Sequence, residues 1–144
     1  MSRVINSDSP AQNRNRLLKL VSSTVLIIIQ SRISEKELND LIAFTILSLA
    51  EIEKTITLTT APWEKREYWV KADQFRSEWI WVSDLRKKLD QSKTAKGWPK
   101  IPPEIFALGE KLKTIEPSKR LQGKEFWKGA YSVLLGKKKI MKPF

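Results

Sequence analysis

One stretch of this sequence combines acidic, basic and aromatic side chains densely enough to suggest chemistry. The sequence predicts a long helix over residues 62–91, and at about 100° per residue four of its charged side chains fall in one sector. These residues are Glu64, Glu67, Lys71 and Glu78. The sector lies between two aromatic stripes, so we expect partial burial. Carboxylates beside a lysine in apolar surroundings can have shifted pKa values, as a polar active site requires.

A structural role explains the same residues better. Glu67 and Lys71 are four positions apart, which is the spacing of an ordinary ion pair on a helix surface. Long charged side chains also lay their stems along aromatic rings while their heads stay in water. We therefore expect a structural ion-pair network here. A ligand-binding or catalytic site, or a contact with a partner, is the alternative.

Two residue types that carry much of enzyme chemistry are missing from the chain. It has no cysteine, which excludes disulfides, thiol nucleophiles and cysteine-ligated zinc. It has no histidine, which removes the commonest general base and the Ser–His type of nucleophile activation. A di-metal carboxylate site in a helical bundle would also need histidine. Glycine-rich phosphate loops are missing as well. We therefore expect no enzyme, no metal site and no bound cofactor.

Positive charge is concentrated in the last third of the chain. The net charge is +11, and residues 93–144 hold thirteen basic and four acidic residues. By contrast, residues 1–61 and 62–92 each hold seven basic and six acidic residues. Clustered cations attract phosphate backbones, and aromatic rings can stack on unpaired bases. The residues predicted to contact an anionic partner are Lys111, Lys113, Lys119, Arg120, Lys124, Trp127, Lys128, Lys137, Lys138 and Lys139.

The composition of this basic set leaves several partners open. Arg120 is its one arginine, and lysine suits diffuse attraction to phosphate better than bidentate reading of bases. No helix-turn-helix, zinc-finger or RNA-recognition motif accompanies it. Nucleic acid is the partner that we favour, with an acidic protein or an anionic membrane surface as alternatives. A solvated basic face without any ligand is the remaining interpretation.

Periodic apolar residues predict the helices that position these side chains. Ser9 to Gln12 and Ser34 to Glu37 both have the capping-box pattern that begins a helix. Thr59 to Pro62 is expected to break the second helix, and a loop with Trp98 set into the edge of the core is expected over 92–103. The expected helices cover residues 10–31, 34–58, 62–91, 103–115 and 123–136.

These elements predict one all-α domain, a compact bundle of about five helices, three long and two short. Residues 1–92 form a nearly neutral three-helix scaffold, 93–136 a basic loop with two short helices, and 137–144 a basic tail. No targeting signal is apparent, and the apolar runs are shorter than the roughly 20 residues of a transmembrane helix. We therefore expect a cytoplasmic protein.

The sequence as a whole predicts a non-enzymatic helical binding protein whose basic C-terminal third contacts a polyanion, with nucleic acid favoured. The alternative is an interaction or structural subunit of a homo- or hetero-oligomeric protein assembly. In that case the second helix, which is apolar on two sides, and the third helix would bury surface against a partner or a second copy.

Overall fold

The computed structural model of the chain describes residues 9–137 and 144, and it confirms an all-α fold with three long and two short helices. No β-strand and no helix able to cross a membrane occurs within that part of the chain. The elements are α1 (Pro10–Gln30), α2 (Glu35–Lys65), α3 (Trp69–Gln91), α4 (Pro103–Lys111), the 3-10 turn η1 (Lys119–Leu121) and α5 (Ala130–Leu134).

The first two helices begin at capping boxes, as predicted. The Ser9 hydroxyl accepts the Gln12 amide at 3.1 Å, and the Gln12 side chain accepts the Ser9 amide at 3.0 Å. Ser34 and Glu37 repeat this arrangement at the start of α2. The hydrogen bonds with Ser34 lower the pKa of the Glu37 carboxyl. This capping contribution is therefore present above the ordinary carboxyl pKa and lost as the pH falls through the lowered value.

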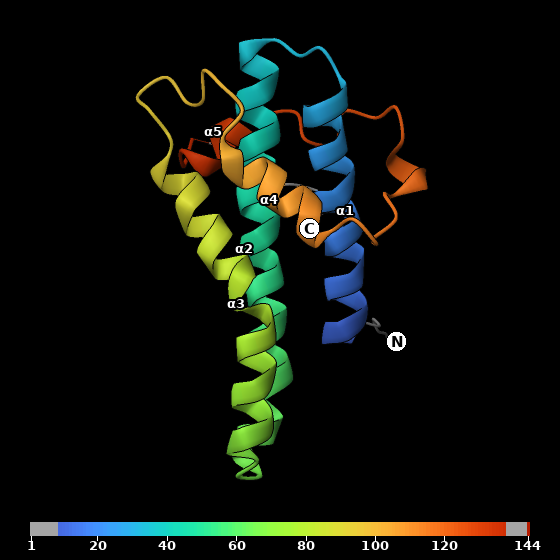
Figure 1. The fold of residues 1–144 in the computed structure, drawn as a ribbon, viewed down its shortest axis with the longest axis vertical. Coiled ribbons are helices and arrows are strands. Elements are labelled where there is room, and N and C mark those ends of the chain that lie inside the picture. Colours follow the sequence, from blue (N-terminus) through green and yellow to red (C-terminus); the bar gives the residue numbers. More distant parts are fainter. Residues whose placement is uncertain (1–8, 138–143) are drawn as a thin grey trace.

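Helix α2 is the centre of the bundle. It packs against α1, α3 and α5, and Figure 1 shows it between the other two long helices. Most of its apolar residues on both sides are buried, and Ile42, Phe44 and Leu49 are fully inaccessible, whereas Leu58 is exposed. Most of the two-sided apolar pattern of this helix is therefore covered within the chain itself.

The predicted boundary between the second and third helices is wrong. Helix α2 does not end near Leu58 but continues through Pro62 to Lys65, and α3 begins at Trp69. Pro62 has no amide hydrogen to donate, so one backbone hydrogen bond of the helix is missing. The helix tolerates this because it ends at Arg66, about one turn later.

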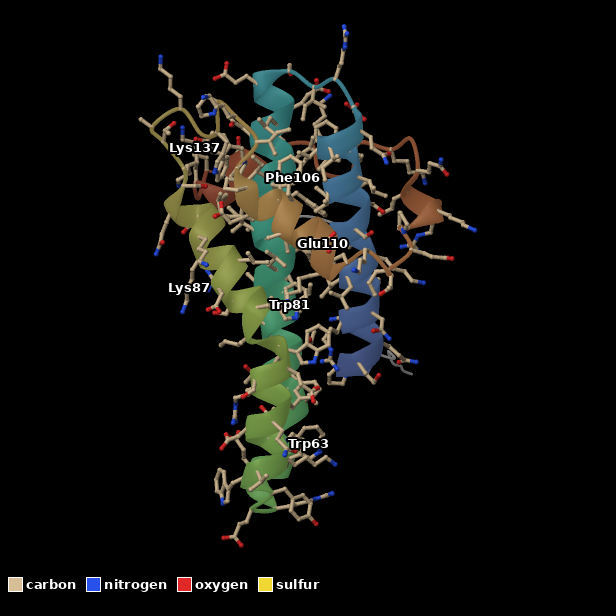
Figure 2. All side chains as sticks on the ribbon, in the orientation of Figure 1. Trp63, Trp81, Lys87, Phe106, Glu110 and Lys137 are labelled. Carbon is tan, nitrogen blue, oxygen red and sulfur yellow. The ribbon has the colours of Figure 1, made fainter. Side chains whose placement is uncertain are left out.

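The turn between α2 and α3 is a Schellman motif built on a glutamate. The Tyr68 amide donates to the Trp63 carbonyl at 2.8 Å, and the Glu67 amide donates to the Glu64 carbonyl at 3.0 Å. Glu67 has a φ of 64°, a left-handed conformation in which glycine is the usual residue. The turn places Tyr68, Trp69 and Val70 at the end of a helical hairpin that extends past the start of α1 (Figures 1 and 2).

The two short helices are shorter than predicted. Helix α4 ends at Lys111, and α5 begins only at Ala130. Pro117 disfavours a helical conformation in the residue before it. Gly123 and Gly129 have φ values of 77° and 85°, which a right-handed helix cannot contain. Residues 112–129 therefore form turns, including η1, that run beside α1 on the side opposite α3 (Figure 1).

Candidate functional site

The acidic and basic residues of the predicted helical sector do not form one cluster. Glu64 lies in the last turn of α2 and pairs with Arg76, whereas Glu67 lies in the turn and is exposed. Lys71 and Glu78 belong to α3 and are also exposed, with the Lys71 ammonium 4.4 Å from the centroid of the Trp63 ring. The shared sector was a wrong prediction because the interhelical turn separates the two pairs of residues.

A carboxylate outside this predicted sector also has a structural role. Glu53 of α2 forms an ion pair with Arg86 of α3, and the hydrogen bond to Glu53 raises the pKa of the Arg86 guanidinium. Across residues 9–137 and 144, no three acidic side chains gather where they could hold a metal ion. Glu53 and Glu64 of α2 therefore connect the two helices of the hairpin through Arg86 and Arg76 of α3.

The structure separates the predicted basic residues into three groups. Lys111, Lys119, Arg120, Lys124 and Lys137 are exposed. Two others are exposed but lie near acidic neighbours, with Lys113 at 3.5 Å from Glu110 and Lys128 at 3.9 Å from Glu125. Lys138 and Lys139 fall outside the residues that the structure describes.

Trp127 departs from its predicted role. Its side chain is 6% exposed and belongs to the hydrophobic core, so its ring is not available to stack on a base. The apolar residues around it explain this position, because a large ring gains more from burial than from exposure beside lysines. A tryptophan at this position correctly indicates burial in the core, but it misled the prediction of a binding residue.

An open groove of about 590 Å³ brings cations from the two ends of the sequence together. One wall is a face of α1 that presents Gln12, Asn15, Arg16 and Lys19, and the other wall is formed by Ser118, Arg120 and Leu121. Among the described residues that line it, none is an aspartate or glutamate. We call this the basic groove. Its three cations, Arg16, Lys19 and Arg120, face a common space, and the Arg16 guanidinium also donates to the Asn13 side-chain oxygen at 2.6 Å.

Two serines of α1 hold the second wall of the basic groove in place. The Ser22 hydroxyl donates to the Ile115 carbonyl at 3.0 Å, and the Ser118 amide donates to the Ser23 hydroxyl at 2.7 Å. Farther along the chain, the Asp40 carboxylate accepts the amides of Gly129 and Tyr131 at 3.1 and 3.0 Å. The segment that carries Arg120 is therefore fixed to the bundle at both ends.

The basic residues of α1 divide between the core and the groove. Arg14 is 6% exposed, and its guanidinium lies 5.0 and 5.2 Å from the ring centroids of Phe75 and Trp79. It donates to the hydroxyls of Thr55 and Thr59, and burial lowers its pKa. Arg14 thus joins α1 to the hairpin, whereas Arg16 and Lys19 lie on the groove face.

A second hollow of about 500 Å³ continues along the same side of α1. It shares Ser118 and Leu121 with the basic groove. Its remaining lining includes the apolar Leu26, Ile27 and Phe126, the amides Gln30 and Gln122, and the charged Glu116 and Lys119. We call it the apolar hollow. Together the two spaces follow α1 from Gln12 to Gln30, a length of about 27 Å at 1.5 Å per residue.

Arg16 and Lys19 were missed by the sequence prediction, although a signal for them exists. Residues 10–30 contain three basic residues and no acidic residue, so this helix is positively charged even though residues 1–61 are nearly neutral. What could not be predicted is that residues 118–121 pack beside it, because that contact spans about a hundred residues.

The basic groove can hold an anion with several oxygen atoms. An arginine offers a planar fork of donors that matches phosphate or carboxylate, and a lysine adds a compact charge. Neighbouring amide side chains at Gln12 and Asn15 can donate further hydrogen bonds.

Comparison of the chain with known protein families, with curated proteins and with solved structures found no match.

Proposed function

We propose that this chain is a non-enzymatic, cytoplasmic binding protein whose basic groove and surrounding lysines hold a polyanion, and that this polyanion is nucleic acid. The observation that carries the proposal is the meeting of Arg16 and Lys19 of α1 with Arg120, from the other end of the sequence, in one open groove. The absence of histidine and cysteine from the sequence supports the non-enzymatic part of the proposal.

A repeating phosphate ligand fits this surface better than a single small anion. The exposed Lys119 and Lys124 extend the positive surface beyond the groove, so cations continue along the segment that borders α1. Each cation that meets a phosphate releases condensed counterions, and the free energy gained grows with the number of contacts. A strand that follows α1 would meet several of these cations at once.

Charge reversal in the groove tests this proposal. We expect the double substitution Lys19→Glu and Arg120→Glu to weaken binding of a labelled oligonucleotide by tenfold or more at low salt. Removing two phosphate contacts should also reduce the salt slope of log Kd by about two. Fluorescence anisotropy at several salt concentrations between about 50 and 200 mM measures both quantities.

The matched control carries the same charge change on another face. Lys87 and Lys88 are exposed on α3, and Figure 2 shows Lys87 on the side of α3 away from α1. Their double replacement by glutamate should leave most of the affinity in place. Equal losses in the two double variants would mean that overall charge, and not the groove, governs binding. Binding that does not depend on salt would contradict the proposal itself.

A second candidate function, assembly with other copies of the chain, is favoured by the end of the α2–α3 hairpin. Tyr68, Trp69 and Val70 are 52%, 54% and 70% exposed, which is unusual for three consecutive apolar residues. The left-handed Glu67 presents them together at the end of the hairpin. Self-association through this end would cover surface that is otherwise in contact with water.

The solution mass tests this candidate. If the hairpin end self-associates, the mass measured by light scattering should exceed the 16.7 kDa monomer at high concentration. Trp69→Ser should then return the protein to the monomer, because it removes the largest of the three apolar side chains. Leu58→Ser, on an exposed residue nearer the middle of α2, is the control. A monomer at every concentration would exclude self-association.

A further inference from the structure

The apolar hollow beside the basic groove has a composition that the polyanion proposal alone does not explain. Glu116 and Lys119 line this space, but its lining also includes the apolar Leu26, Ile27 and Phe126, which a phosphate does not need. Its volume of about 500 Å³ lies within the usual 300–1,000 Å³ of small-molecule sites. A ligand that occupies both spaces must therefore have an anionic part and a flat or bulky apolar part.

The polar residues at the rim of this hollow suit a ligand with both donors and acceptors. Gln30 and Gln122 are exposed, and within the described residues neither side chain makes a hydrogen bond. A glutamine amide offers two donors and one acceptor oxygen. It can therefore form hydrogen bonds with either the acceptors or the donors on the edge of a nucleobase. Phe126 is half-buried, held edge to face against Phe44 with ring centroids 5.2 Å apart.

The two spaces are arranged in the same order as the parts of a nucleotide. Ser118 and Leu121 line both of them, so the basic groove and the apolar hollow meet at this pair of residues. A phosphate beside Arg16, Lys19 and Arg120 would leave the attached base next to the apolar hollow. Bases within a duplex are stacked and paired, and they would have to be flipped out to enter such a space.

We infer that the apolar hollow accepts an unpaired base, so that the protein binds single-stranded nucleic acid in preference to a duplex. This inference rests on the proposed function, since the same groove holds the phosphates. A base contributes apolar faces that can contact Leu26 and Phe126 and a polar edge that Gln30 and Gln122 can reach. Base contacts of this kind tolerate different sequences, because every base has an apolar face.

Three ligands of equal length separate this inference from the proposed function. They are an oligothymidylate of about 12 nucleotides, an abasic strand with the same number of phosphates, and the matching duplex. We expect the oligothymidylate to bind about tenfold more tightly than the abasic strand, since stacking contributes a factor of this order per base. The duplex should bind no more tightly than the abasic strand. Fluorescence anisotropy at one fixed salt concentration compares them.

A variant of the hollow sharpens the comparison. Leu26→Ser removes an apolar contact without changing charge, so the preference for the oligothymidylate should fall several-fold while binding of the abasic strand stays the same. Leu58→Ser makes the same exchange on α2 and should change neither affinity. Circular dichroism of the Leu26 variant checks that it is folded.

Each result has a distinct consequence. Equal binding of the abasic strand and the oligothymidylate would overturn the inference but leave polyanion binding intact. Tightest binding to the duplex would overturn it in the same way. If none of the three ligands binds at low salt, the proposed function itself fails and the inference fails with it.

Discussion

Replacing Gly97 with alanine is expected to lower the free energy of unfolding by about 3 kcal/mol. The residue has a φ of 92°, which costs an L-amino acid about 1–2 kcal/mol. A Cβ atom there would also lie 2.3 Å from the side-chain oxygen of Asn39. That side chain cannot move freely, because its oxygen accepts the Trp98 amide at 2.7 Å and its nitrogen donates to the Lys96 carbonyl at 3.0 Å. Losing these bonds adds about 1 kcal/mol each.

Urea unfolding followed by circular dichroism measures this loss, and a matched glycine separates its two causes. Gly123 has a similar φ of 77°, but a Cβ atom there would have no neighbour within 4 Å. Gly123→Ala should therefore cost about 1 kcal/mol, which is the backbone strain alone. In an Asn39→Ala background the cost of Gly97→Ala should fall toward the same value. Equal losses at the two glycines would show that contact with Asn39 contributes nothing.

Much of the fold follows from local sequence signals. The capping boxes at Ser9 and Ser34 act within one turn of helix, and both were predicted correctly. Trp98 was expected at the edge of the core, and it is 1% exposed, with its ring nitrogen 2.9 Å from the Ser92 hydroxyl. Pro62 misled the prediction because the distance to the end of the helix, and not the proline itself, decides whether a helix tolerates it.

The candidate site was predictable only in part, since it depends on contacts between distant residues. The charge of Arg120 was visible in the sequence, and so was the lack of acidic residues around Arg16 and Lys19. Their shared groove depends on the hydrogen bonds of Ser22 and Ser23 to residues 115 and 118, which no local pattern indicates. Trp127 shows the opposite error, because an aromatic residue among lysines suggested binding while it packs in the core.

Asp40→Ala is expected to release the C-terminal segment and to lower the free energy of unfolding by about 3 kcal/mol. The Asp40 carboxylate is 8% exposed and accepts the amides of Gly129 and Tyr131. An alanine would leave both amides without an acceptor, at about 1–3 kcal/mol for each buried one. Urea unfolding measures the loss, and hydrogen exchange at Tyr131 should accelerate. Asp84→Ala, at an exposed residue of α3, is the control and should change stability by less than about 0.5 kcal/mol.

The same Asp40 variant also separates two explanations of polyanion binding. The substitution removes a negative charge from a chain of net charge +11, so binding by overall charge alone would become slightly tighter. The basic groove instead needs the segment that carries Arg120 to stay fixed beside α1. Once Asp40 no longer anchors that segment at Gly129, binding must also order it, and we expect an affinity about threefold weaker or more. A tighter complex would mean that the groove is not the binding site.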